Sequence, residues 1–444
     1  MENKENAQNP VYEKINQDIV DTMTQSGSSY YFALGLSFFG FVLFWIVPWI
    51  YQLFTGQGIT GLNTPSVWGI YLVNFVFWIG ISHSGTLLSA ILFITETPWR
   101  RAIYRSAEAM TFFSVLTAAL FIFVHLGRPW NFYWLLPIPN FRYLWVNFSS
   151  PLMFDVFAIG TYMTSSAIFL YFGSIPDLAA VRDRVTGWRK PIYTTLALGW
   201  RGTDFEWHWL FRAYTFFAVL IIPLAVSVHS IVSWDFALSN VAGFAQTIFA
   251  PYFVVGAIYS GSAGIITLIA ILRKTLKMEK YITPDHFNKV NMLLVALSLI
   301  WTYINILEIM TSYYANNTFE NDILAYRMWT PPYSYLFWLM ILVNSVFPLL
   351  LIFKKVRFSI TLSVLISLGI NVGMWLERYL IIAPSLSRKF LPFMWHNYFP
   401  SWIEISITLG SFSFFTMLFL LFVKFWPSVS IYEVKEDFGI LLKK

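Results

Sequence analysis

Long apolar segments recur along the chain and are separated by short polar stretches. A helix needs about 20 mainly apolar residues to cross the hydrocarbon layer of a membrane, and ten segments meet this requirement. They are residues 30–54, 66–95, 106–126, 151–172, 210–233, 247–272, 291–314, 333–353, 358–382 and 402–426. The pattern therefore predicts an all-α polytopic membrane protein with ten transmembrane helices.

Lysine and arginine collect on one side of these predicted spans. If both termini lie inside, six basic residues fall on the outer side, which leaves 23 of the 29 on the inner side. The outer six are Arg128, Arg142, Arg327, Arg378, Arg388 and Lys389. Because short cytoplasmic loops carry the excess of basic residues, we expect both termini to be cytoplasmic. The net charge of +6 is then explained by basic residues on the cytoplasmic side of the membrane, and no nucleic-acid partner is expected.

Composition agrees with a membrane protein and narrows its chemistry. The chain is 57% hydrophobic and only 12% charged, whereas soluble domains carry about 25% charged residues. Residues 1–29 are polar and lack the apolar core of a cleavable signal peptide, so we expect the first span to be retained. Cysteine is absent, which excludes disulfides, thiolate zinc sites and cysteine-ligated iron–sulfur clusters within this chain. Any such cluster would belong to a partner.

A faint internal repeat suggests two bundles. Residues 81–94 read ISHSGTLLSAILFI and residues 258–271 read IYSGSAGIITLIAI. Each copy is followed by a basic loop and three more spans, as expected for parallel repeats. We predict four-helix bundles from spans two to five and six to nine, although small residues also recur wherever membrane helices pack closely. The predicted parts are 1–29 (tail), 30–65 (first span), 66–233 and 234–382 (bundles), 383–426 (last span) and 427–444 (tail).

Ionisable side chains gather at the outer ends of three predicted spans. His125 ends the third span, Arg128 follows it by one turn, and Asp155 lies about one turn into the fourth. His229 and Asp235 lie near the outer end of the fifth. A base and a carboxylate at matched depth can accept protons from a hydroxyl donor that enters from the bilayer. The alternatives are a hydrogen-bonded helix-end histidine and an acid favoured by the helix dipole.

The loop that joins the third and fourth spans is rich in aromatic residues. It covers 127–150 and also contains three prolines. Its aromatic residues include Trp130, Phe132, Tyr133, Trp134, Phe141, Tyr143 and Trp145. Such rings favour the membrane interface, so they can form a simple surface belt. Alternatively, the loop covers a cavity that opens sideways to lipid.

A second set of ionisable residues lies deeper or in the second bundle. His83 is near the middle of the second span, Glu308 is about two turns from the outer end of the seventh, and Glu377 and Arg378 are near the end of the ninth. Charged groups inside a membrane are costly, so they mark candidate proton relays. Glu377 can instead simply pair with Arg378. We expect residues 177–184, within the sequence PDLAAVRDR, to be a solvated inner loop with salt bridges.

Several other site types are not expected. Glycine-rich phosphate motifs, zinc-ligand spacings and a serine triad are not recognised in the sequence. A bis-histidine haem would need two histidines on facing helices at one depth, and His125 and His229 are the candidates among six histidines. We expect neither haem nor iron–sulfur cluster in this chain.

Four motifs, in order, resemble those of a known family. They are the loop from GRPW to PIPN, then SPLMFDVFAIGTY, IPDLAAVRDR and SVHSIVSWDFA. Together they resemble the NrfD family, the membrane subunits of polysulfide reductase and related complexes, over residues 67–426. Within that family, the chain most resembles the C subunits of bacterial alternative complex III.

The resemblance implies a function and partners. It implies a quinol site at the periplasmic face, with His125 and Asp155 as the binding and proton-accepting pair. It implies an iron–sulfur subunit docked there, c-type cytochrome subunits, a paralogous NrfD-like membrane subunit, and a location in the bacterial inner membrane. By the same resemblance, residues such as His83 and Glu308 would carry protons across the membrane.

We therefore expect this chain to be the menaquinol-oxidising subunit of a respiratory complex. The subunit is not expected to be active alone. Two alternatives remain. A proton-coupled transporter or channel also has repeated bundles with buried ionisable residues, but here the ionisable residues cluster at the outer rim. An anchor subunit without a site of its own would leave His125 and Asp155 unexplained.

Overall fold

The computed structural model describes residues 10–138, 151–389 and 391–437, and these residues are predominantly helical. The elements are α2 (Pro10–Thr24), α3 (Ser28–Phe41), η1 (Val42–Ile46), α4 (Val47–Thr55), η2 (Gln57–Ile59), α5 (Ile70–Ile94), η3 (Pro98–Arg100), α6 (Tyr104–His125), η4 (Pro129–Leu135), α7 (Pro151–Arg182), α8 (Arg189–Leu196), α9 (Asp204–Ala237), α10 (Phe249–Thr275), α11 (Pro284–Ala315), α12 (Thr318–Trp329), α13 (Tyr333–Ile341), η5 (Leu342–Val346), η6 (Phe347–Ile352), α14 (Lys354–Arg357), α15 (Ile360–Ser387), η7 (Pro392–Met394), α16 (Trp402–Phe425) and α17 (Ile431–Asp437).

The predicted polytopic all-α class is confirmed. Within the described residues, nine helical segments are long and apolar enough to cross a membrane. The remaining predicted span corresponds to α5, whose 25 residues reach about 37 Å at 1.5 Å per residue. The first span is continuous through α3, η1 and α4, and the eighth through α13, η5 and η6.

Several helices extend beyond the predicted spans. The apolar pattern predicts that the fourth span ends at residue 172, but α7 continues to Arg182. It predicts the fifth span over 210–233, but α9 begins at Asp204, where Thr203 and Glu206 form a capping box, and ends at Ala237. Polar turns can continue a helix past the hydrocarbon layer, which an apolar window cannot detect. These extensions change the depth of several ionisable residues.

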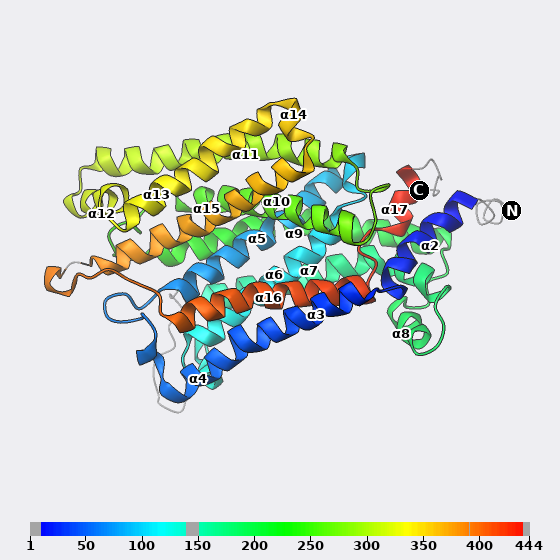
Figure 1. The fold of residues 1–444 in the computed structure, drawn as a ribbon, viewed down its shortest axis with the longest axis horizontal. Coiled ribbons are helices and arrows are strands. Elements are labelled where there is room, and N and C mark those ends of the chain that lie inside the picture. The colour runs from blue at the N-terminus through cyan, green and yellow to red at the C-terminus, as the bar shows by residue number, and fades with distance from the viewer. Residues whose placement is uncertain (1–9, 139–150, 390, 438–444) are drawn as a thin grey trace.

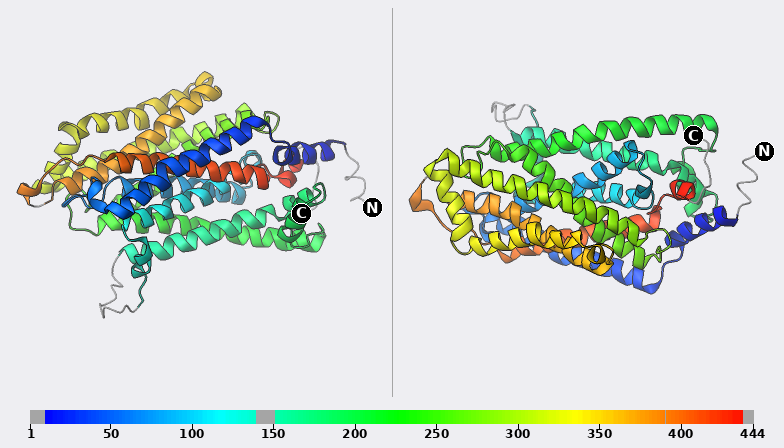
Figure 2. Two further views of the ribbon diagram at one scale, coloured as in Figure 1. Left: turned by 60° about the horizontal axis from the view of Figure 1, so that its bottom comes forward. Right: turned by 90° about the horizontal axis from the view of Figure 1, so that it is seen from above.

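The axes of the long helices are roughly aligned with the long axis of the molecule (Figure 1). Both described chain ends, with α2, α8 and α17, lie at one end, which we call the terminal face. The connections that contain η4, α12 and η7 lie at the other end, which we call the opposite face. The two views in Figure 2 show the same arrangement.

Two sets of four spans share one pattern of neighbours. In the first, α5 and α7 each contact α6 and α9; in the second, α10 and the span α13–η6 each contact α11 and α15. The helices that carry the sequence repeat, α5 and α10, also pack against each other. This pattern supports parallel repeats, and the boundaries of the two bundles stay a prediction.

The first and last spans pack together outside these two sets. Helix α16 lies beside α3 and contacts η1 and α4 (Figure 1). At Gly410 of α16, a Cβ atom would lie 2.7 Å from the backbone nitrogen of Trp45. The missing side chain therefore permits the close approach of the two spans, as is common for small residues between membrane helices.

Candidate functional site

A cavity of about 210 Å³ lies among the ends of four helices near the opposite face. His125 comes from the last residue of α6, Asp155 from the second turn of α7, and Asp235 from the last turn of α9. The remaining lining is apolar or aromatic: Trp68, Tyr71, Leu72, Phe75, Phe121, Ile122, Leu126, Leu135, Leu152 and Val156. The structure thus brings together three of the five predicted quinol-binding residues in one apolar cavity.

Side chains from the first span and from η2, which follows it, hold the end of α6 that carries His125. The amide nitrogen of Gln57 donates a hydrogen bond to the carbonyl oxygen of His125 at 3.0 Å, and Gln52 donates to the carbonyl of Val124 at 3.3 Å. Gln52 also accepts a hydrogen bond from the hydroxyl of Tyr71 at 2.6 Å. These bonds satisfy carbonyl groups that the helix itself leaves free at its end. They fix the backbone of His125 relative to the cavity.

The two carboxyl groups in the cavity are close enough to share a hydrogen bond. Asp155 and Asp235 interact through their side chains, and both residues are buried, with 4% and 6% of their surface exposed. An ionised carboxylate can only accept a hydrogen bond, so this contact needs one proton on the pair. A pair that holds one proton can therefore accept a second proton while the two side chains stay in contact.

Three polar atoms of the cavity residues lack a hydrogen-bond partner among the described residues. They are Nδ1 of His125, Oδ1 of Asp155 and Oδ1 of Asp235. Buried polar atoms are normally satisfied, and an unsatisfied group carries the full cost of its lost hydration. Three such atoms in one apolar cavity indicate a site for a ligand that has polar groups on an apolar body.

Arg128 lies beside the cavity and does not line it. It lines a neighbouring pocket with Asn131 and Trp134 on η4, and the two pockets share Leu126 and Leu135. The predicted aromatic loop is described only in part, because Phe141, Tyr143 and Trp145 lie outside the described residues. Its described rings are exposed, whereas Leu135 of η4 reaches the cavity. Leu135 thus brings the described part of this loop to the cavity, and an interfacial belt and a lateral opening to lipid both stay predictions.

His229 lies deeper than the predicted outer layer. Because α9 continues to Ala237, His229 is more than two turns from the helix end, about 9 Å below Asp235. Its ring lies 4.7 Å from the ring of His83, which in turn stacks on Tyr162 at 4.6 Å. Nδ1 of His83 is 2.7 Å from the carbonyl oxygen of Ile79. His229 is thus a neighbour of His83 and does not line the cavity of Asp155.

The other predicted ionisable residues form two buried ion pairs in the second set of spans. Glu377 contacts Arg378 at 3.2 Å, as the simple pairing alternative predicts, and it also accepts a hydrogen bond from Trp301 at 3.4 Å. Glu308 pairs with Arg327 at 3.0 Å. Two of the arginines assigned to the outer segments from the sequence are therefore buried.

Contacts connect these groups to the histidine pair. The guanidinium of Arg378 lies 4.3 Å from the centre of the Phe253 ring, which lies 5.9 Å from the ring of His229. At Gly256 a Cβ atom would lie 2.9 Å from Arg378, so the glycine makes room for this arrangement. Of the predicted relay residues, His83, Glu377 and Arg378 thus lie with His229 along one chain of buried contacts between the two sets of spans.

The expectation of a solvated loop at 177–184 is wrong for residues 177–182, which belong to α7. Asp177 is buried in α7, pairs with the buried Arg105 of α6 at 3.0 Å, and accepts hydrogen bonds from the backbone nitrogens of Ile431 and Tyr432 at 3.0 Å each. Arg182, Asp183 and Arg184 do form exposed salt bridges as expected.

Sequence reasoning also missed Glu108. This buried residue of α6 accepts hydrogen bonds from Ser89 at 2.9 Å and from Tyr214 at 2.7 Å. The signal was present in the sequence, because Glu108 stands inside the predicted span 106–126, where a charged residue is exceptional. Its partners on α5 and α9 were not predictable from spacing.

Comparison with known proteins identifies the family. The family model described as polysulphide reductase, NrfD, matches residues 58–388. The chain belongs to the NrfD family. The match covers the cavity residues and both buried ion pairs, and it confirms the resemblance inferred from the four motifs.

Two similar proteins are named as C subunits of reductases, and the name of the first also describes it as a membrane subunit. The chain is 29% identical over 226 residues to a protein assigned as the membrane C subunit of dimethyl sulfoxide reductase from Halobacterium salinarum, and the match covers 50% of the chain and 47% of that protein. It is 25% identical over 186 residues to the C subunit of selenate reductase from Mesobacillus selenatarsenatis, with 40% of the chain and 42% of that protein covered. The matches span less than half the length of either relative. They associate this NrfD chain with membrane subunits of oxidoreductase complexes.

Proposed function

We propose that the chain is the quinol-oxidising membrane subunit of a respiratory complex, with menaquinol as the substrate and the C subunit of alternative complex III as the specific role. The observation that carries the proposal is the set of unsatisfied polar atoms of His125, Asp155 and Asp235 in an apolar cavity. A quinol has two hydroxyl groups on an apolar ring, so its polar and apolar parts match those of the cavity.

The cavity residues would bind the quinol and receive its protons. Nδ1 of His125 can accept a hydrogen bond from one hydroxyl if Nε2 carries the ring proton, and Oδ1 of Asp155 can accept from the same headgroup. Oxidation of quinol to quinone releases two electrons and two protons. His125 can take one proton, and the Asp155 and Asp235 pair can take the other. The apolar wall excludes water and contacts the ring.

Electrons would leave through a partner protein. The cavity lies near the opposite face, which offers a docking position for an iron–sulfur subunit that passes electrons to c-type cytochromes. If the opposite face is periplasmic, as the positive-inside rule indicates, the protons leave to the periplasm of a bacterial inner membrane. A paralogous NrfD-like subunit would complete the membrane part of the complex.

The buried route offers a path for proton translocation. His83 and His229 lie next to each other, and the contact of Arg378 with Phe253 leads to Glu377 and Trp301. Tyr252 accepts a hydrogen bond from Asn305 at 2.9 Å, one turn of α11 before Glu308. Internal ionisable groups of this kind are the usual members of proton relays. We propose His83, His229, Glu308 and Glu377 as members, with Arg378 as the counter-charge.

The proposal is tested by two substitutions in the assembled complex. His125→Ala and Asp155→Asn are each expected to slow quinol-dependent reduction of the downstream haems by about 10²–10⁴-fold while the complex stays assembled. The matched control is Asp204→Asn, which changes an exposed carboxylate at the other end of α9 and is expected to leave turnover unchanged. Normal turnover in both purified cavity variants would exclude this site and favour an anchor or transport function.

A further inference from the structure

The cavity that His125, Asp155 and Asp235 line is enclosed by a ring of four helices. Helix α5 packs against α6 and α9, and α7 packs against the same two helices, so the ring has four seams. An apolar tail that leaves this cavity for the bilayer must pass between two neighbouring helices. What covers each seam near the opposite face therefore decides where such a tail can lie.

Two of the four seams are covered by other spans. The seam between α5 and α9 is covered by α10, which packs against both helices, and the ring of Phe236 on α9 there lies 5.7 Å from that of Phe253 on α10. The seam between α5 and α6 is covered by the first span. Its Gln52 bridges the two helices, because it accepts a hydrogen bond from Tyr71 of α5 and donates one to the carbonyl of Val124 of α6.

The other two seams differ in their chemistry. The seam between α7 and α9 holds Asp155 and Asp235, whose side chains interact, so an apolar tail in this seam would separate a buried polar pair at a high cost. The seam between α6 and α7 is aliphatic where it borders the cavity. Its cavity-lining residues are Ile122 and Leu126 on α6, and Leu152 and Val156 on α7.

The four aliphatic side chains of the α6–α7 seam form two layers. The two residues on each helix are four positions apart and therefore lie on one helical face. Because α6 ends and α7 begins near the opposite face, Leu126 lies near the depth of Leu152, and Ile122 lies with Val156 about 6 Å deeper. Leu152 is 40% exposed although it lines the cavity. Its side chain thus borders both the cavity and the outside of the bundle.

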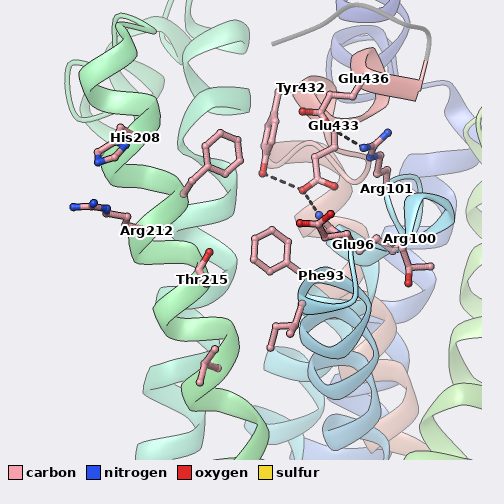
Figure 3. A pocket seen from close by; sticks show the side chains of 14 residues that line it. Phe93, Glu96, Arg100, Arg101, His208, Arg212, Thr215, Tyr432, Glu433 and Glu436 are labelled. Carbon is pink, nitrogen blue, oxygen red and sulfur yellow. Dashed lines mark hydrogen bonds and ion pairs between the residues drawn. The ribbon is translucent and has the colours of Figure 1, made fainter. Parts of the chain in front are cut away.

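A larger opening lies at the other end of the molecule and does not serve this cavity. It is a crevice of about 630 Å³ at the terminal face, between α9 and the end of α5, η3 and α17 (Figure 3). Its wall is held by Glu433, which pairs with Arg100 at 2.8 Å and accepts a hydrogen bond from Tyr432 at 3.2 Å. Phe93 of α5 lines this crevice and lies about 27 Å along the helix from Phe75 of the cavity.

We infer that the α6–α7 seam is the lipid opening of the cavity and that it holds the isoprenoid tail of the bound quinol. The inference rests on the proposed function, because it needs a quinol headgroup in the cavity. It adds a second determinant of specificity. The polar cavity residues recognise the headgroup, whereas the aliphatic seam recognises the tail, since apolar contact with the first isoprene units favours binding. The protein therefore selects tailed quinols over the same headgroup without a tail.

The inference is tested by steady-state kinetics of the purified complex with two quinols that share a headgroup. One is dimethylnaphthoquinol, which has no tail, and the other carries an isoprenoid tail on the same ring. Leu152→Trp fills the seam and is expected to raise the KM for the tailed quinol about tenfold relative to the KM for the tail-less quinol, because overpacking at this site excludes the tail. The ratio of the two KM values cancels any change in headgroup binding.

Two matched variants show whether the change belongs to the seam. Phe154→Trp enlarges a side chain of α7 that is 46% exposed and does not line the cavity, and it is expected to leave the KM ratio unchanged. Phe75→Leu changes the buried α5 wall of the cavity and is expected to alter both KM values by the same factor. Leu152 and Phe154 are both exposed enough to accept tryptophan, so folding is expected to be unaffected, which thermal unfolding checks.

A photoreactive quinone locates the tail without turnover. A tailed naphthoquinone with a diazirine in its first isoprene unit is expected to label the aliphatic residues of α6 and α7 in the wild-type complex. Labelling of α10 or of the first span would overturn the inference and leave the quinol site intact, and so would a wild-type KM ratio in Leu152→Trp. Failure of the wild-type complex to oxidise either quinol would overturn the proposed function, and this inference with it.

Discussion

Asp155 of α7 and Asp235 of α9 both line the cavity that His125 borders, and their side chains are close enough to interact with each other. The two residues are 80 positions apart in sequence, but both stand near the opposite-face ends of antiparallel helices that pack along their length. The proposed proton acceptor is therefore a pair contributed by two helices rather than one carboxylate.

If the pair acts as a unit, its two members are not independent. Asp155→Asn and Asp235→Asn are each expected to slow quinol-dependent reduction of the acceptor by about 10²–10⁴-fold, because an amide cannot take up the proton. The double variant is expected to be no slower than the slower single variant, since either change removes the shared proton site. The rates are measured at saturating quinol. Losses that multiply in the double variant would show that the two carboxyls act separately.

The position of His125 is expected to depend on Gly127. Gly127 has φ of 67°, and an added Cβ atom would lie 2.8 Å from the amide nitrogen of Gln57, the donor to the His125 carbonyl. Gly127→Ala is therefore expected to displace this donor and to lower kcat/KM for quinol about tenfold, less than removal of His125 itself. Gly160→Ala on α7 is the control, because no atom lies within 4 Å of its Cβ position. Unchanged kcat/KM in Gly127→Ala would show that the Gln57 contact does not position the site.

The convergence of the cavity residues could be predicted from sequence because it depends on local rules. Consecutive spans are antiparallel, so residues near the same end of neighbouring spans share a depth, as His125, Asp155 and Asp235 do. The boundaries of the spans were less predictable. The predicted end of the fifth span at residue 233 placed His229 at the rim, whereas four more residues of α9 carry it below the cavity and next to His83.

Long-range contacts of charged residues could not be predicted at all. The apolar window ends at residue 172 and so assigns Asp177 to a loop, but α7 continues past it. Its partners are Arg105, 72 residues earlier, and the backbone of α17, more than 250 residues later. No sequence pattern links these three segments, since an ion pair between distant helices leaves no periodic signal.

The Asp177 contacts lead to a prediction about stability. Asp177→Asn leaves Arg105 buried without its counter-charge and weakens the cap of α17, so we expect a loss of about 3–5 kcal/mol. Thermal unfolding measures the loss, and limited proteolysis between α16 and α17 reports release of the C-terminal helix. The control is Asp183→Asn, which breaks a pair whose carboxylate side chain is 58% exposed and is expected to change stability by at most about 1 kcal/mol. Equal effects of the two substitutions would contradict the structural role of Asp177.

The attachment of α17 is also expected to depend on pH through Lys435. Its ammonium lies 3.4 Å from the centre of the Tyr12 ring of α2, and the residue is 3% exposed. Burial lowers the pKa of Lys435 to about 7, while Asp177 and Glu13 nearby raise that pKa and Arg184 lowers it further. No ion pair joins Lys435 to a carboxylate among the described residues, so its charged form is poorly compensated.

The sign of the effect follows from the lowered pKa. Between about pH 7 and the ordinary lysine pKa of about 10.4, the unfolded or released segment binds more protons than the docked one, so docking strengthens as pH rises through this window. Below pH 7 the cost of burying the charge is fully present. Lys435→Met removes the charge and keeps an apolar chain against Tyr12, so the variant is expected to be more stable than wild type at pH 6.5. This difference is expected to shrink steadily towards pH 10. Protease release of α17 measured across this range, as the ratio of variant to wild type, cancels the titration of Glu13 and Asp177. A ratio that does not change with pH would show that Lys435 stays charged when docked.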